Sequence, residues 1–147
     1  MLEEITFQSL DVLRDSLIRP HLINARPAPD KMKEALQEHG VAIGLLEVAA
    51  ATGAVVNGRS IMNSDVVFFS DAGHMGVGQV YFFCSVGTES LCCLSPWQVT
   101  QRSSHFFKAV VVDSPCIIPV GLLHSSATYA PANVGNVSTI LLQCSFH

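Results

Sequence analysis

Residues 65–94 read DVVFFSDAGHMGVGQVYFFCSVGTESLCCL, and this stretch decides the class of fold. Three β-branched and aromatic runs, separated by turn-forming residues, predict three consecutive antiparallel strands. A symmetric turn at Val86–Glu89 would place Phe83 opposite Cys92 and Phe82 opposite Cys93. Side chains alternate along a strand, so one face of this ribbon is expected to line a core and the other to meet a helix or a partner.

Three glycines, Gly73, Gly76 and Gly78, fall between the first two runs. They predict a flexible hairpin turn, because glycine adopts positive φ without strain. The spacing reverses the order of the dinucleotide-binding fingerprint, and a strand rather than a helix follows it. A phosphate-binding loop is therefore not expected.

The overall composition indicates one domain with little charged surface. The chain has 147 residues, of which 49% are apolar and 14% charged, against about 25% charged in typical proteins. The net charge of −4 argues against direct nucleic-acid binding, which normally requires a basic patch. Such a chain is expected to be compact or to form part of an assembly.

Neither a membrane span nor a secretory leader is predicted. No apolar run reaches the ~18 residues of a transmembrane helix. The start Met-Leu-Glu-Glu lacks the basic and apolar regions of a signal peptide. We therefore expect an intracellular protein, cytoplasmic or nuclear, that is not secreted.

Charge is distributed unevenly along the chain. Residues 1–59 carry 14 of the 20 charged side chains, and none follows Asp113. This asymmetry predicts a solvated helical cap over residues 1–40 and a packed β barrel over residues 41–147, within a single domain.

Two short helices are expected in the cap. Leucines at helical spacing predict one over residues 9–18, ended by Pro20. Asp30 as N-cap and Gly40 as C-terminal stop bound a second helix over residues 31–39.

The segment 41–56 is ambiguous, because its alanines favour a helix whereas its first residues alternate as in a strand. We predict a strand over 41–46. Asn57-Gly58 is a strong hairpin signal and is expected to join residues 54–56 to 60–62.

The second half of the chain continues the β pattern. We predict a polar loop over 98–104 and strands near 106–112, 116–118, 121–129 and 137–144. Short strands recurring every 8–12 residues or so predict a barrel or a sandwich.

The five cysteines predict a thiol-reduced protein without metal or other cofactors. Their number is odd, and no pair has Cys-x-x-Cys spacing. Cys84 and Cys116 lie in apolar runs, where a thiol is usually inert packing. A Cys–His nucleophilic pair involving one of them is an alternative.

The histidines offer one further alternative. Asp71 and His74 share the glycine-rich turn, so a metal site with His105 or His124 is conceivable. No H-x-H or H-E-x-x-H spacing supports it, and solvated histidines are the simpler interpretation.

Binding residues are predicted where loops meet one end of the sheet, as loops on rigid scaffolds often carry function. Trp97 lies just past a strand end; it serves either as a binding ring or as cover for the barrel mouth. The candidate binding residues are Trp97, Tyr81, Asp71, His74, Arg102 and His105.

A family resemblance rests on residues 64–69, 77–83, 117–120 and 137–142, within residues 57–143. Together they resemble the bromo-adjacent-homology and SH3-like β modules, especially the version that accompanies transposon-encoded proteins of the Kyakuja-Dileera-Zisupton type. The resemblance implies a binding module in a nuclear or DNA-associated protein, without the catalytic carboxylates of a transposase.

The prediction from sequence is thus a mainly-β fold, a small SH3-like barrel with two short N-terminal helices. The expected function is non-catalytic recognition of a protein or peptide. The alternatives are a small enzyme with a histidine–metal or cysteine–histidine site, and a self-assembling structural protein. The charge-free segment 114–147 is the expected subunit contact of a homodimer.

Overall fold

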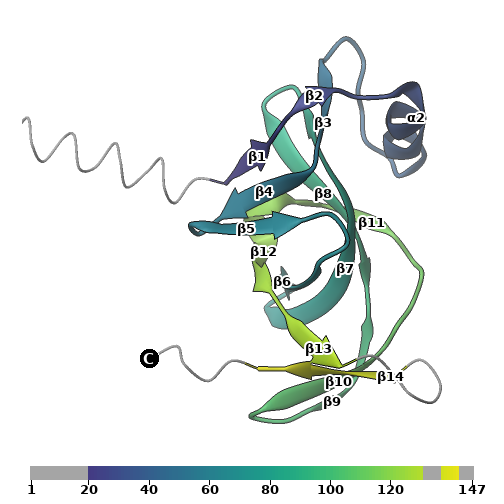
Figure 1. Cartoon of the computed structure of the whole chain (residues 1–147). Helices are drawn as coiled ribbons and strands as arrows, with labels where there is room; N and C mark the ends of the chain where they lie inside the picture. The colour runs from purple at the N-terminus through teal and green to yellow at the C-terminus, as the bar shows by residue number, and fades with distance from the viewer. Residues whose placement is uncertain (1–19, 131–136, 143–147) are drawn as a thin grey trace, which may run out of the picture.

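The computed structural model describes residues 20–130 and 137–142. This part is mainly β, with several antiparallel sheets and one α-helix (Figure 1). The elements are, in chain order, β1 (His21–Ile23), β2 (Arg26–Pro27), α2 (Asp30–Glu38), β3 (Val48–Ala51), β4 (Gly53–Val56), β5 (Arg59–Met62), β6 (Val66–Asp71), β7 (His74–Val86), β8 (Glu89–Pro96), β9 (Gln98–Arg102), β10 (Phe106–Val110), β11 (Cys116–Pro119), the 3-10 helix η1 (Val120–Leu122), β12 (Leu123–Ser126), β13 (Thr128–Ala130) and β14 (Val137–Leu141).

The three strands predicted from residues 65–94 are β6, β7 and β8. The β7–β8 hairpin turns at Gly87 and Thr88, and Val86 pairs with Glu89. Phe83 lies opposite Cys92 and Phe82 opposite Cys93. The predicted register is confirmed, because a two-residue turn fixes the pairing of the strands on either side of it.

The glycine-rich stretch is strand rather than a long flexible turn. The turn consists of Ala72 and Gly73 alone, both at positive φ, and Asp71 pairs with His74. Gly76 and Gly78 lie within β7, where neighbouring strands approach closely. A Cβ on Gly76 would lie 2.7 Å from the Phe69 Cζ atom. The prediction was wrong at these two glycines because they provide space inside the sheet.

Tyr81 is a bulge residue in β7. The β7–β8 register shifts between Val80 and Phe82. Val80 and Phe83 consequently face one cluster of buried side chains, whereas Phe82 and Cys84 face another. The extra residue turns Tyr81 outward and bends the strand.

β7 links two parts of the main sheet, the part that contains β6 and the part that contains β3. Residues 74–79 pair with β6 on one edge, residues 83–86 pair with β3, and β8 pairs along the opposite edge. Strands β12, β6, β7, β8 and β11 are hydrogen-bonded in that order.

The predicted closed barrel does not form within the described residues. β11 and β12 continue into each other through η1 and pair with β8 and β6, not with each other. Two further sheets have the orders β1-β4-β5 and β13-β14-β10-β9. The sequence signals strands and turns, but closure depends on distant edges that local patterns do not specify.

The Asn57-Gly58 hairpin is confirmed, since both residues have positive φ and join β4 to β5. The strand predicted over residues 41–46 is wrong, because the strand starts later, at Val48. Gly44 is at positive φ, and the Leu46 N–H donates to the Ile43 carbonyl oxygen at 3.0 Å. This turn interrupts the apparent alternation before β3 begins.

The polar loop predicted over residues 98–104 is also wrong, since β9 occupies its first five residues. β9 is a sheet edge that pairs only with β10 in the described part. An edge strand can carry polar side chains, so the hydropathy of this segment did not indicate a strand. The later strands are confirmed, although the segment 121–129 divides into η1, β12 and β13. Residues 143 and 144 of the last predicted strand lie outside the described residues.

The predicted second helix is α2, and Gly40 ends it as expected. The Gly40 N–H donates to the Gln37 carbonyl oxygen, and the Val41 N–H donates to that of Leu36. These two bonds form the C-terminal motif that favours glycine at positive φ. The N-cap is Pro29 rather than Asp30, which instead opens the first turn.

The predicted N-terminal cap differs from the structure in other respects. Residues 9–18, where the other helix is expected, lie outside the described residues. In the remainder of the cap, residues 21–27 hold two short strands, β1 and β2. Each pairs with a strand of the main body, β4 or β3, so this segment extends the sheets. No helix within the described ranges is long and apolar enough to cross a membrane.

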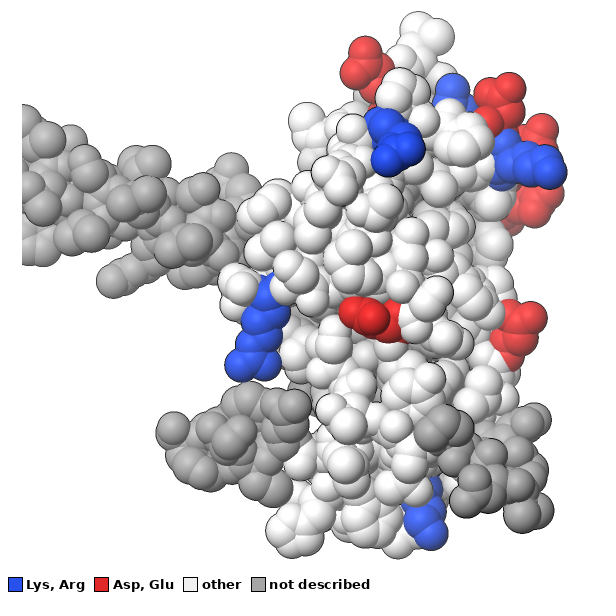
Figure 2. Space-filling view, in the orientation of Figure 1, with Lys and Arg blue, Asp and Glu red and all other residues white. Residues whose placement is uncertain are grey.

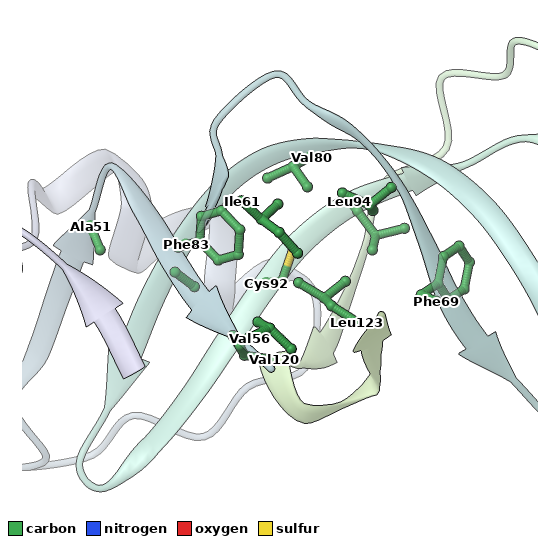
Figure 3. Close-up of a cluster of buried hydrophobic side chains, with 12 residues drawn as sticks. Ala51, Val56, Ile61, Phe69, Val80, Phe83, Cys92, Leu94, Val120 and Leu123 are labelled. Atoms are coloured by element: carbon green, nitrogen blue, oxygen red, sulfur yellow. The ribbon is translucent and has the colours of Figure 1, made fainter. Parts of the chain in front are cut away.

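Three groups of buried side chains support these layers. The first is enclosed by β3–β8, η1 and β12, and its side chains point toward one another (Figure 3). The second lies between α2 and the opposite face of β7 and β8, around the fully buried Leu36. The third lies between β6 and the sheet β13-β14-β10-β9. Of the two alternatives for the second face of the central ribbon, a helix or a partner, the structure shows a helix, α2.

Candidate functional site

A groove of about 500 Å³ opens where the β4–β5 hairpin, β6, β7, β12 and β14 meet. This volume lies within the usual range of ligand sites. Apolar atoms contribute most of the surface that lines it, although polar residues outnumber apolar ones. The apolar lining residues are Phe68, Met75, Leu141 and Leu142. The polar ones are Asn57, Arg59, His124, Ser125, Ser126 and Thr128.

The floor of the groove is held by aromatic packing. Phe68 on β6 is 9% exposed and meets Phe107 edge to face, with ring centroids 6.1 Å apart. Met75 and Leu141, by contrast, are 38% and 48% exposed. The groove thus combines a rigid floor with apolar walls that a ligand would cover.

Hydrogen bonds fix the polar side of the groove. The Ser70 Oγ and His124 Nε2 atoms are 2.7 Å apart. The Ser126 hydroxyl donates to Asp65 Oδ2 at 3.2 Å, and the Met62 N–H donates to the same oxygen at 2.9 Å. These contacts tie β12 to the turn before β6.

Trp97 does not line the groove. Its side chain is 7% exposed and belongs to the third buried group, with Tyr129 packed edge to face at 5.7 Å. The Trp97 N–H donates to the Val77 carbonyl oxygen at 2.8 Å. This position agrees with the alternative that Trp97 covers the end of the core.

Arg102 and His105 do not line the groove but contact residues that do. The Arg102 Nη1 atom donates to the Met75 carbonyl oxygen at 2.8 Å, and its guanidinium lies 4.7 Å from the Phe107 ring centroid. The His105 carbonyl oxygen accepts from the Leu142 N–H at 2.9 Å. Both residues therefore support Met75 and Leu142, which do line the groove.

The other predicted site residues do not line the groove. Asp71 and His74 face each other across the β6–β7 turn, directly before Met75. Tyr81 lies on the bulge of β7, and its hydroxyl donates to Asp113. That hydrogen bond, followed by burial, raises the pKa of Tyr81. The structure thus brings only the neighbourhood of Met75 into the groove.

The residues that line the groove are spread between positions 57 and 142, so no short sequence motif predicts them. One local signal existed for Arg59, which directly follows the Asn57-Gly58 turn. His124, one of the alternative metal ligands, lines the groove, but its Nε2 atom is already hydrogen-bonded to the Ser70 hydroxyl. Among the described residues, no three His, Cys, Asp or Glu side chains gather to hold a metal ion.

The described thiols are held protonated. Burial raises the pKa of Cys84 and of Cys93 from 9.0 to about 11, and raises the pKa of Cys92 and Cys116 as well. Because the thiolate is the reactive form, these residues are poor nucleophiles near neutral pH. Packing is therefore the role that their positions support.

We expect the buried thiols to react slowly in the native protein. With a pKa of about 11 instead of 9.0, the thiolate of Cys84 is about 100-fold scarcer at mildly alkaline pH. A chromogenic disulfide reagent should label native Cys84, Cys92 and Cys93 far more slowly than the same residues in concentrated guanidinium chloride. All five cysteines should react after denaturation, and rapid native labelling of Cys84 would contradict this placement.

Figure 2 shows that acidic and basic side chains gather over the end of the molecule that holds α2, at the top of the view. Arg59 is the one Lys, Arg, Asp or Glu among the described residues that line the groove. No protein-family model matches this sequence and no curated protein matches it, so its function is inferred from these residues and their geometry.

Proposed function

We propose that this chain is a non-catalytic recognition module that binds a protein or peptide in the groove. The observation that carries the proposal is a groove of about 500 Å³ with mostly apolar surface, a buried aromatic floor and exposed apolar walls. Exposed apolar surface that borders a cavity is typical of an interaction site. The protonated thiols favour this function over cysteine nucleophilic catalysis.

The proposed architecture is SH3-like. It is supported by five strands in the order β12-β6-β7-β8-β11, with the 3-10 turn η1 between the last strand and the first. The resemblance to bromo-adjacent-homology modules of transposon-encoded proteins remains part of this proposal, as does an intracellular location. The net charge of −4 favours a protein partner within such an assembly over contact with DNA phosphates.

A charge placed on the groove wall should weaken binding without unfolding the protein. Leu141 is 48% exposed, so Leu141→Lys should alter the free energy of unfolding by less than about 1 kcal/mol. Desolvating the new ammonium group against an apolar ligand should weaken affinity at least about 10-fold. The measurement is fluorescence anisotropy with labelled peptides selected from a displayed library.

Val111→Lys is the matched control. Val111 is 38% exposed but does not line the groove, so affinity should not change. Equal effects of the two lysines would indicate a nonspecific effect of charge and would remove the groove from consideration.

We further propose that residues 114–147 contribute to a homodimer. Val137 on β14 is 41% exposed and does not line the groove. Sedimentation at high micromolar concentration should find a dimer, and Val137→Lys should convert it to a folded monomer. A monomeric unmodified protein would show that this segment does not mediate self-association.

A further inference from the structure

The described part of the chain begins beside the groove. His21 of β1 pairs with Val55 of β4, and Asn57, two positions beyond Val55, lines the groove. β1 is antiparallel to β4, so the start of β1 lies toward the turn that joins β4 to β5 (Figure 1). Residues 1–19 are therefore joined to the body of the protein at the edge of the groove.

The sequence of this N-terminal segment contains an apolar face. Leu10, Leu13 and Leu17 occupy positions i, i+3 and i+7 of the helix that the sequence predicts over residues 9–18, and these positions share one face of a helix. Asp15 would fall on the opposite face. A helix of this length is marginal in water and depends on the packing of its apolar face. A stable helix here therefore requires an apolar surface to pack against.

The groove provides an apolar surface at the point where the segment is attached. Met75 and Leu141 on its walls are 38% and 48% exposed, beside the buried Phe68. Amphipathic helices bind apolar grooves through side chains at positions i, i+3 and i+7. The spacing of the three leucines is therefore the spacing that such a groove recognises.

The other end of the chain also adjoins the groove, because residues 143–147 follow the lining residue Leu142. Their sequence, QCSFH, contains one large apolar side chain, that of Phe146. A single apolar anchor matches the exposed walls less well than three leucines on one face. The N-terminal segment is therefore the favoured occupant.

We propose that residues 9–18 bind in the groove of their own chain as an amphipathic helix, with the three leucines against its apolar walls. This inference rests on the proposed function, because the helix regulates the same groove by competing with the partner. A competitor on a short flexible linker acts at an effective concentration of about 1 mM. A helix with an intrinsic dissociation constant of about 0.1 mM would thus weaken the apparent affinity for a partner about 10-fold.

The first test is methyl NMR spectroscopy of the full chain. Nuclear Overhauser effects should connect the methyl groups of Leu10 and Leu17 with the methyl group of Met75. Leu13→Gln removes the central apolar side chain of the face and should abolish these contacts. Asp15→Gln is the matched control on the opposite face and should retain them. Unchanged chemical shifts in β8 should show that the sheets of both variants remain folded.

The second test measures competition by fluorescence anisotropy. The probes are labelled peptides selected from a displayed library on the Leu13→Gln chain. They should bind this variant about 10-fold more tightly than the unmodified chain, because the competing helix no longer occupies the groove. Asp15→Gln should bind them with the affinity of the unmodified chain.

The two tests separate this inference from the proposed function. Peptides that bind all three chains equally, without leucine contacts to Met75, would refute the helix and leave the recognition function intact. Leucine contacts to Met75 without any selected peptide would support the helix and count against recognition of a separate partner.

Two other results would overturn the proposed arrangement. Contacts found only between a labelled and an unlabelled copy of the chain would show that the helix binds a second molecule. Contacts between Phe146 and Met75, in place of the leucine contacts, would assign the groove to residues 143–147.

Discussion

Phe83→Ala is expected to lower the stability of this protein more than truncation of any half-buried side chain. The Phe83 side chain has no exposed surface and lies in the cluster of Figure 3, among residues of β4–β8 and β12. Removing a fully buried phenyl ring costs about 3–5 kcal/mol, because the surrounding layers cannot collapse into the space. The free energy of unfolding, measured by denaturant titration with the slope compared between variants, should fall by this amount.

Phe82→Ala is the matched control on the preceding residue. Phe82 is half-buried on the opposite face of β7, against the cluster that α2 covers. Its truncation should cost about 1–1.5 kcal/mol, in line with the smaller apolar area lost. A larger loss for Phe82 than for Phe83 would mean that the two faces of the ribbon are exchanged.

Gly78→Ala is expected to destabilise the protein although it adds only one methyl group. A Cβ at this position would lie 2.6 Å from the Ser95 carbonyl oxygen and 3.1 Å from the Pro96 Cα atom. Both are backbone atoms of β8, so relief requires the paired strands to separate. Overpacking of this kind costs about 1–3 kcal/mol, and thermal and denaturant unfolding should both show it.

The same substitution at Gly121 provides the contrast. A Cβ there would meet no atom within 4 Å, and Gly121 is not at positive φ. Gly121→Ala should be neutral or stabilising by up to about 1 kcal/mol, because alanine restricts the unfolded chain. If Gly78→Ala were equally harmless, the close approach of β7 and β8 at Gly78 would be wrong.

Prediction from sequence was most accurate beside short turns. The turn at Gly87 and the Asn57-Gly58 turn each contain two residues, so the hairpin register could be counted outward from them. The same local logic located the end of α2 at Gly40. These features depend on backbone dihedral preferences within a few residues.

Prediction failed where distant segments decide the conformation. In the sequence, Gly78 resembles a turn residue. Only the fold shows that the backbone of Ser95, 17 positions later, lies against it. β9 resembles a loop because its polar side chains lie on a sheet edge. The prediction of a closed barrel failed for the same reason. No local pattern in β11 or β12 indicates what lies along the edge of each strand that faces away from β8 or β6.

The candidate site was only partly accessible from sequence. Asp71 and His74, in the turn before Met75, were predicted to bind; neither lines the groove, but Met75 does. Its other walls come from the β4–β5 hairpin, β12 and β14, which sequence patterns do not bring together. Trp97 was a candidate because it lies just past a strand end, yet its packing against Tyr129 gives it a supporting position.

The length of β7 has a consequence for how the molecule opens. Met75, near the start of this strand, lines the groove, whereas Cys84 and Val86, near its end, pack in the layer beneath α2. Local unfolding of either end must therefore detach a strand that the other end also uses. Because both regions share this strand, they form one cooperative unit. A change that destabilises the packing beneath α2 should therefore lower the fraction of molecules in which the groove is folded.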